Sequence, residues 1–250
     1  MRTSRVFLSQ KIQPGSRVDL DLDNAHYVAR VLRQKPGAHL ILFDGYGGEF
    51  LGTITQAAGK SVSVTVGERQ NVERESPCTV ELVLGLSKGD RMDVAIQKAV
   101  ELGVGSITPV MTERSVVRFD SARGAKRTEH WRQVVKSACE QCGRNRSPTV
   151  RQPTSLERWL DERPTPSLDD VQLMLNPKAT QSFNDVQRSA PPRRLSLVIG
   201  PEGGFTPNEE AYAEQRGVLG VRFGPRILRA ETAAIAALTA VQVLWGDLNQ

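Results

Sequence analysis

The sequence predicts two parts: an N-terminal domain built from short strands and a larger α/β domain whose sheet is mostly parallel. Short apolar and β-branched runs fill most of the first seventy residues, and a polar stretch without apolar periodicity follows at residues 67–77. After that stretch, apolar runs alternate with stripes of helical spacing, which is typical of a parallel sheet with helices on its faces. We therefore expect domains at residues 1–72 and 73–250.

The N-terminal domain is expected to contain several strands and one helix. Its strands are expected at residues 4–8, 17–20, 39–43, 49–55 and 61–66. Residues 44–48 (DGYGG) favour a hairpin turn. Asp23 is expected to cap the helix, whose apolar stripe consists of Tyr27, Val28, Val31 and Leu32. These elements indicate a small barrel or sheet.

The second domain is expected to alternate strands and helices. Its strands are expected at residues 80–86, 106–111, 171–175, 195–200 and 218–223. Its helices are expected at residues 90–102, around the apolar stripe 131–139 with an end at Gly143, from Thr206 to about Gly217, and at 232–245. The longer loops, 151–170 and 176–194, are expected at the surface or over a site.

The composition is that of a folded, soluble protein. The 250 residues are 39% hydrophobic and 24% charged, which excludes a disordered or collagen-like chain. No apolar run approaches the roughly 18 residues of a membrane helix, and the N-terminus has no apolar core of signal-peptide length. Three cysteines are too few for a disulfide framework, so we expect a cytoplasmic location.

Positive charge is concentrated in one stretch of the chain. Between Met111 and Arg151 there are ten basic and four acidic side chains, although the net charge of the whole chain is only +5. A concentrated positive surface favours a polyphosphate partner, because cations that neutralise phosphates release counterions. A solvated helix face is the alternative explanation.

Residues 197–210 (LVIGPEGGFTPNEE) lead from a buried strand through glycines into a helix. Thr206 is predicted as the N-cap, Pro207 as the first helical residue and Glu209 as the partner in a capping box. Gly200, Gly203 and Gly204 let the backbone turn sharply and present amide donors to a ligand. The loop matches neither the dinucleotide fingerprint nor the P-loop, and a turn needed only for packing is the alternative.

Charged residues stand directly before the apolar final helix. Arg226, Arg229 and Glu231 are seldom found at such a place unless they pair with each other or meet a ligand. A structural ion pair between Arg229 and Glu231 remains open.

The motif Cys139-x-x-Cys142 is a candidate for redox or metal chemistry, but its context argues against both. The pair is predicted at a helix C-terminus, whereas a reactive thiolate favours an N-terminus, and no second pair completes a zinc site. His26, His39 and His130 are scattered along the chain, so we expect no metal.

Four motifs together resemble one family, the RsmE ribosomal RNA methyltransferases of the SPOUT superfamily. The motifs are residues 199–205 (IGPEGGF), 226–233 (RILRAETA), 140–144 (EQCGR) and 86–92 (LSKGDRM). Residues 2–8, His26, residues 31–33 and residues 43–45 also match, whereas residues 151–170 show no distinctive match. The resemblance implies a SPOUT α/β-knot domain, with a mostly parallel sheet and a C-terminal trefoil knot, after an N-terminal PUA-like β-barrel that binds RNA.

The resemblance also implies an activity and a site. The expected reaction is methylation of N3 of one uridine in small-subunit ribosomal RNA, by a homodimer that uses S-adenosylmethionine. The residues expected to bind this cofactor are Leu175, Asn176, Ile199, Gly200, Glu202, Gly203, Gly204, Leu228 and Thr232. The residues expected to contact RNA phosphates are Arg2, Arg5, Arg30, Arg33, Arg114, Arg123, Lys126 and Arg132.

N3 of uracil carries a proton at neutral pH, so its methylation requires a base or a strong electrostatic field. We expect Arg144 and Arg229 to stabilise the uracil oxygens or a phosphate, and Glu231 or Glu140 to accept the proton or orient an arginine. A non-catalytic RNA-binding factor for ribosome assembly is the alternative function. A hydrolase or an NAD enzyme would lack its own motifs.

Overall fold

The computed structural model describes residues 3–58, 61–167, 169–186 and 191–249. The chain forms two compact units: residues 1–75 with 139–147, and residues 76–138 with 148–250. Residues 139–147 thus group with the N-terminal part, which their place in the sequence did not indicate. The domain boundary at residue 72 stays a prediction.

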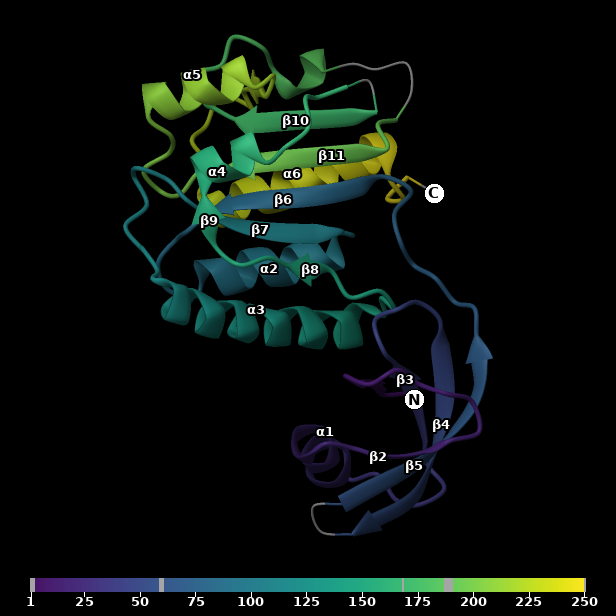
Figure 1. Ribbon diagram of the computed structural model, residues 1–250. Coiled ribbons are helices and arrows are strands. Elements are labelled where there is room, and N and C mark those ends of the chain that lie inside the picture. The colour runs from purple at the N-terminus through teal and green to yellow at the C-terminus, as the bar shows by residue number, and fades with distance from the viewer. Residues whose placement is uncertain (1–2, 59–60, 168, 187–190, 250) are drawn as a thin grey trace. The chain divides into compact units, whose positions relative to one another are not determined.

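The first unit is built on a mixed sheet (Figure 1). Its strands are β1 (Arg5–Phe7), β2 (Arg17–Asp19), β3 (His39–Phe43), β4 (Glu49–Ala58) and β5 (Ser61–Gln70). They lie in the order β1-β3-β4-β5-β2, with β1 parallel to β3 and the other pairs antiparallel. Apolar side chains of these strands form one buried cluster with Ala25 and Val28 of the helical segment.

Two local features of the first unit differ from the predictions. Asp21, not Asp23, caps helix α1 (Leu22–His26), because its carboxylate accepts the Asn24 N–H at 2.8 Å. The chain then continues as a π-helical turn, η1 (Tyr27–Val31), in which Val28 is buried but Tyr27 and Val31 are exposed. In addition, β5 extends to Gln70, so residues 67–70 belong to a strand and not to the expected linker.

The second unit contains a parallel sheet. Its strands are β6 (Thr79–Gly85), β7 (Ser106–Met111), β8 (Thr149–Val150), β9 (Thr154–Ser155), β10 (Asp170–Leu175), β11 (Arg194–Ile199) and β12 (Leu219–Val221). They lie in the order β12-β10-β11-β6-β7-β8, β9 also pairs with β7, and every pair is parallel. The predicted fold class, a mostly parallel α/β sheet, is confirmed, whereas the knot stays a prediction.

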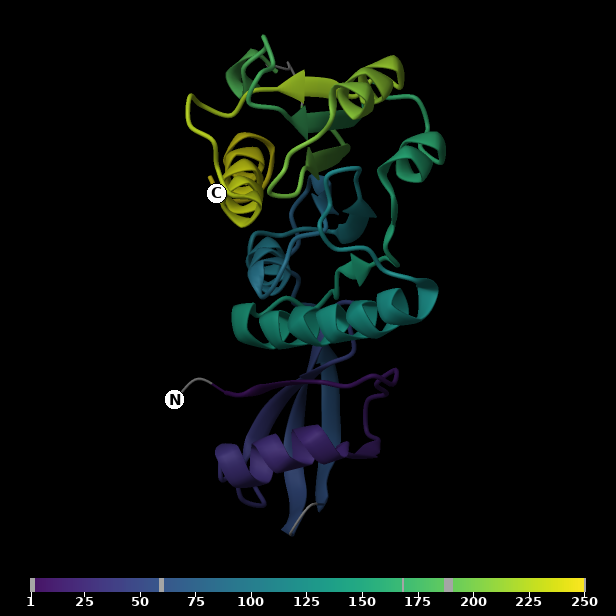
Figure 2. The ribbon, with the colours of Figure 1, turned by 90° about the vertical axis from the view of Figure 1, so that its left-hand side faces the viewer.

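Helices cover both faces of this sheet. The helices that follow β6 in the chain are α2 (Arg91–Glu101), α3 (Ser121–Cys142), α4 (Leu156–Asp161), α5 (Pro207–Gln215) and α6 (Ala230–Trp245), with a 3-10 turn, η2 (Phe183–Asp185). Figure 2 shows α2 and α6 on one face and α4 and α5 on the other. On the α4 side, Trp159 and Leu160 pack against Val83, Val110 and Val198. Residues 151–170, expected as a loop, therefore contain the short strand β9 and helix α4, and the apolar side chains of α4 belong to the core.

Candidate functional site

A cavity of about 650 Å³ lies in the second unit, at the carboxyl ends of β10 and β11. This is where ligands bind to open parallel sheets. Three segments line it: residues 175–178 after β10, residues 199–205 after β11, and residues 223–230 before α6, joined by Arg114, Glu210 and Ala233. A volume of this size suits a small organic molecule.

The loop after β11 has the conformation that its sequence predicts. The Thr206 hydroxyl accepts the Glu209 N–H at 3.3 Å, and the Glu209 carboxylate accepts the Thr206 N–H at 2.8 Å, so the capping box is confirmed. Gly204 has φ +66°, a left-handed conformation that favours glycine. A turn closed by the Gly204 N–H and the Pro201 carbonyl at 2.8 Å precedes the cap. The turn and the capping box therefore fix the backbone conformation of the loop that lines the cavity.

The last residue of β6 allows this loop to lie close to the sheet. A Cβ atom added to Gly85 would lie 2.4 Å from the Pro201 nitrogen and 2.8 Å from the Gly200 carbonyl carbon. Only a residue without a side chain permits that approach. Sequence reasoning did not identify Gly85, since the sequence places it within the expected strand 80–86 and does not show which segment approaches it.

Two arginines outside the loop hold its backbone and side chains. Arg91 donates to the Glu202 carboxylate at 2.6 Å, and Arg114 donates to the Gly203 and Phe205 carbonyls at 3.1 and 2.9 Å. Burial alone would raise the pKa of Glu202, but hydrogen bonds from its own backbone, from Arg91 and from Lys88 lower it below its ordinary value. Glu202 is therefore a stable anion at the edge of the cavity.

Comparisons with known proteins show which family has this arrangement. The family described as "RNA methyltransferase domain" matches residues 74–242, and the family described as "RNA methyltransferase PUA domain" matches residues 20–67. The ribosomal RNA small subunit methyltransferase E of Buchnera aphidicola (Schizaphis graminum strain) is 33% identical over 248 residues, covering 99% of both chains.

The chain belongs to the ribosomal RNA small subunit methyltransferase E family. Two solved structures are similar to this chain in fold as well as in sequence. A methyltransferase of Legionella pneumophila in complex with the cofactor SAM is 39% identical with a TM-score of 0.92, covering 99% of this chain and 100% of that one. The family member from Neisseria gonorrhoeae bound to S-adenosyl methionine is 35% identical with a TM-score of 0.90, at the same coverage.

Most residues that the sequence assigned to a cofactor in this family member lie at the cavity. Leu175, Asn176, Ile199, Gly200, Glu202, Gly203, Gly204 and Leu228 line it, whereas Thr232 is exposed and does not. Among the residues that sequence reasoning missed, Phe223 and Ala233 contribute apolar surface. They carry no signal beyond their apolar character, so the sequence alone could not select them.

The predicted catalytic residues are divided between the two units. Arg229 lines the cavity, and Glu231 lies two residues further on, in the first turn of α6. The Glu231 Oε2 atom is buried and has no hydrogen-bond partner among the described residues, and no Arg229–Glu231 ion pair forms there. Arg144 and Glu140 belong to the first unit.

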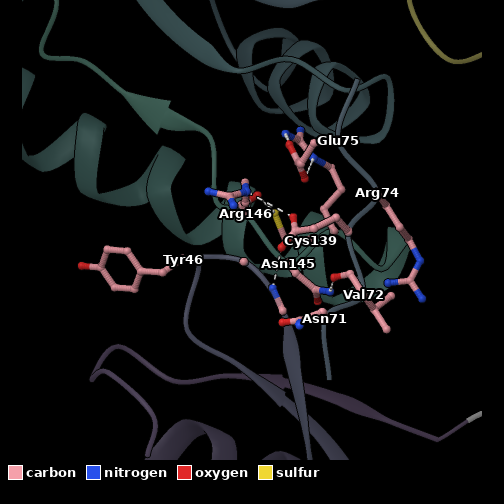
Figure 3. Close-up of polar contacts among 12 residues, drawn as sticks. Tyr46, Asn71, Val72, Arg74, Glu75, Cys139, Asn145 and Arg146 are labelled. Carbon is pink, nitrogen blue, oxygen red and sulfur yellow. Dashed lines mark hydrogen bonds and ion pairs between the residues drawn. The ribbon is translucent and has the colours of Figure 1, made fainter. Parts of the chain in front are cut away.

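In the first unit, two arginines lie inside a buried ionic cluster. Arg144 is 4% exposed and pairs with Glu75, and Arg5 is 9% exposed and donates to Glu49 at 2.6 Å and to the Asn145 side chain. Figure 3 shows the part of this cluster around Glu75 and Asn145. A phosphate cannot reach Arg5 while these contacts hold. Arg5 therefore acts as a buried structural cation in this unit, and its contact with RNA stays a prediction.

The other predicted RNA contacts differ in accessibility. Arg30, Arg33, Arg114, Arg123, Lys126 and Arg132 are exposed, and Arg2 lies outside the described residues. Arg123 and Arg132 make exposed ion pairs with Asp120 and Glu129, which contribute little to stability and leave both guanidinium groups available.

The three cysteines form no disulfide, and Cys78 and Cys139 are buried. Cys139 is buried, and burial raises the pKa of its thiol to about 12, so it is protonated at neutral pH. The described residues contain no group of three or more histidine, cysteine or acidic side chains placed to hold a metal. In the same part of the chain, no helix is long and apolar enough to cross a membrane.

Proposed function

We propose that this chain methylates N3 of a uridine in small-subunit ribosomal RNA, with S-adenosylmethionine as the methyl donor and in the cytoplasm. The observation that carries the proposal is the cavity: it is lined by eight of the nine residues that the family resemblance assigned to the cofactor. Two solved relatives, each covering 99% of this chain, are bound to that cofactor.

The lining of the cavity suits the cofactor's two chemical halves. Leu175, Ile199 and Leu228 offer apolar surface for the flat adenine ring. The glycine loop offers main-chain groups that no side chain shields. The Glu202 carboxylate offers a negative charge for the positively charged groups of the cofactor. A cavity of about 650 Å³ falls within the common range for ligands of this class.

When bound, S-adenosylmethionine supplies an electrophilic methyl group on a sulfonium. The residues of this chain then have two tasks, which are to orient the uracil and to remove the proton from N3. Arg229, which lines the cavity, is proposed to stabilise negative charge on the uracil oxygens. Glu231 is proposed as the proton acceptor, because its unpartnered, buried Oε2 is a carboxylate oxygen with free acceptor capacity.

Arg144 and Glu140 are proposed to act on the reaction only indirectly. Arg144 is held by Glu75, and the Glu140 carboxylate accepts the Phe7 N–H at 2.9 Å, so both side chains have structural work in the first unit. A direct role for either would require these contacts to open when RNA binds. We therefore assign the chemistry to Arg229 and Glu231.

The target uridine must leave its base pair for N3 to react, because N3 lies on the Watson–Crick edge. Exposed arginines and lysines of both units are proposed to bind the surrounding phosphates of free RNA or of an assembled small subunit.

We also propose a homodimer, since Ile227, Val243, Leu244 and Leu248 expose large apolar side chains near α6.

The experiment that tests the proposal compares methylation rates at saturating S-adenosylmethionine and RNA. Arg229→Ala and Glu231→Gln should each lower the rate at least about a hundredfold while cofactor affinity by calorimetry stays within a few-fold. The matched control is Arg158→Ala, an exposed arginine of the same unit whose partner is Glu162. Wild-type rates in both test variants would overturn the catalytic assignment. Strong RNA binding without any methylation by the wild-type chain would favour the assembly factor.

A further inference from the structure

The turn between β3 and β4 carries an exposed aromatic side chain that the proposed chemistry does not use. Tyr46 is 71% exposed, although it stands in the middle of the glycine-rich segment 44–48. In Figure 3 its ring points away from the polar cluster that contains Asn145 and Arg146. An exposed aromatic residue needs no explanation by itself, so its significance depends on the backbone that carries it.

The backbone beneath Tyr46 is fixed by hydrogen bonds on both sides. The buried Asp44 carboxylate accepts the Tyr46 N–H at 3.2 Å and the Ile12 N–H at 3.0 Å. The Gly47 N–H donates to the Asn145 carbonyl at 3.1 Å, and the Ser147 N–H donates to the Gly45 carbonyl at 3.2 Å. The turn is therefore tied to residues 145–147, far away in the sequence.

Glycines in this turn let two guanidinium groups approach the backbone beside Tyr46. A Cβ atom added to Gly47 would lie 2.4 Å from a Glu73 carboxylate oxygen and 2.9 Å from an Arg146 terminal nitrogen, and one added to Gly48 would lie 2.8 Å from Arg69. Arg69 donates to the Gly47 carbonyl at 3.0 Å, and Arg146 forms an ion pair with Glu73 at 3.1 Å. Both cations are thus held against the backbone of the turn that carries Tyr46.

We infer that Tyr46, Arg69 and Arg146 form a preorganised platform on which one unpaired base of the RNA substrate stacks. The ring offers a flat π-face, and the arginines offer positive charge for the phosphates on either side of that base. Because the turn and the guanidinium groups are already ordered, little conformational entropy is lost on binding. This inference rests on the proposed function, since it requires that the substrate is RNA with unpaired bases.

The chemistry of the platform favours RNA over a peptide partner. Stacking on a single exposed ring needs no pocket, and every base has a π-face, so the contact tolerates sequence variation. A peptide would need an apolar groove, whereas the side chains nearest to the glycines that follow Tyr46 are charged: Glu73, Arg146 and Arg69. The platform therefore adds affinity and register rather than a base-specific code.

The test measures affinity of the full chain for a single-stranded RNA that carries 2-aminopurine in place of successive bases. Tyr46→Ala should weaken binding by about 5- to 100-fold and abolish the 2-aminopurine quenching at one position. Tyr46→Phe, which keeps the ring, should bind within about twofold of the wild type. The salt dependence of binding should be unchanged in Tyr46→Ala, because no charge is removed.

Tyr27→Ala is the matched control, because Tyr27 is another partly exposed tyrosine of the same unit, outside the turn. It should keep both affinity and quenching. Equal binding by Tyr46→Ala and the wild type, or equal losses in Tyr46→Phe and Tyr46→Ala, would overturn the platform. Thermal unfolding at the wild-type temperature would show that the variants remain folded.

The same measurements separate the platform from the function on which it rests. If Tyr46→Ala binds and methylates RNA like the wild type, the platform is refuted and the methyltransferase proposal stands. If the wild-type chain neither binds nor methylates small-subunit RNA, both proposals fail.

Discussion

Substitution of Gly85 by alanine tests whether the glycine loop must lie against β6 for the cavity to bind a ligand. The added Cβ would meet the Pro201 nitrogen at 2.4 Å and the Pro201 Cδ atom at 2.5 Å. Neither atom belongs to a flexible side chain, so neither can rotate away. Since ordinary van der Waals contacts begin at 3.4 Å, the loop or the strand must move by about 1 Å.

The expected cost follows from that displacement. Overpacking of this kind destabilises a protein by about 1–3 kcal/mol, which lowers the Tm by roughly 3–10 °C for a domain of this size. A shift of about 1 Å in groups that position a substrate can cost about a hundredfold in rate. We therefore expect Gly85→Ala to fold, to unfold earlier, and to lose at least about tenfold in affinity for S-adenosylmethionine.

The assay is thermal denaturation together with isothermal titration calorimetry, using Gly124→Ala as the matched control. Gly124 lies in α3, and a Cβ there would make only ordinary contacts at 3.7 Å or more. Alanine should therefore leave binding unchanged and stabilise the helix by about 0.5–1 kcal/mol. Wild-type cofactor affinity in Gly85→Ala would refute the reasoning.

Three further predictions concern charge, capping and thiol reactivity. Burial would raise the pKa of Glu49, but hydrogen bonds and charge, above all from Arg5, hold it below the ordinary 4.5. The Glu49 carboxylate therefore stabilises the fold at neutral pH, and this stability is lost progressively below about pH 5. Glu49→Gln should cost about 3 kcal/mol at pH 7 in urea unfolding and flatten the acid dependence; an unchanged pH profile would contradict this. Thr206→Ala should cost about 1 kcal/mol by the same assay and Thr206→Ser almost nothing, whereas equal losses would exclude a capping role for the hydroxyl. Burial raises the pKa of Cys78 to about 11 and that of Cys139 to about 12, so peptide mapping should find both unlabelled by iodoacetamide at pH 8 in the native protein, and fast native labelling would contradict their burial.

The sequence predicted best those features that depend on neighbouring residues. The capping box of Thr206 and Glu209 joins groups three residues apart, so its geometry follows from the helix itself. The strand at Ser106–Met111 and the glycine loop after β11 were likewise legible from local pattern. Helix α1 shows the limit of this reasoning, because Asp21 and Asp23 are equally good caps by residue type and only the structure selects Asp21.

Features that depend on distant residues could not be predicted. Arg5 reads as a surface cation, yet Glu49 and Asn145, 44 and 140 residues away, enclose it in a buried cluster. Similarly, Arg91 and Glu202 are 111 residues apart. Arg91 follows β6 and Glu202 follows β11, and they meet only because these two strands are neighbours in the parallel sheet. Hydropathy patterns carry no information on which charge will meet which, so these pairs require the fold.

The most direct test of the central claim is nucleoside mass spectrometry after reaction of the purified chain with small subunits that lack the modification. With S-adenosylmethionine carrying a labelled methyl group, we expect one labelled 3-methyluridine per small subunit, and none when Arg229→Ala replaces the wild type. Label on a ribose oxygen or on another base, or no label in RNA at all, would contradict the account.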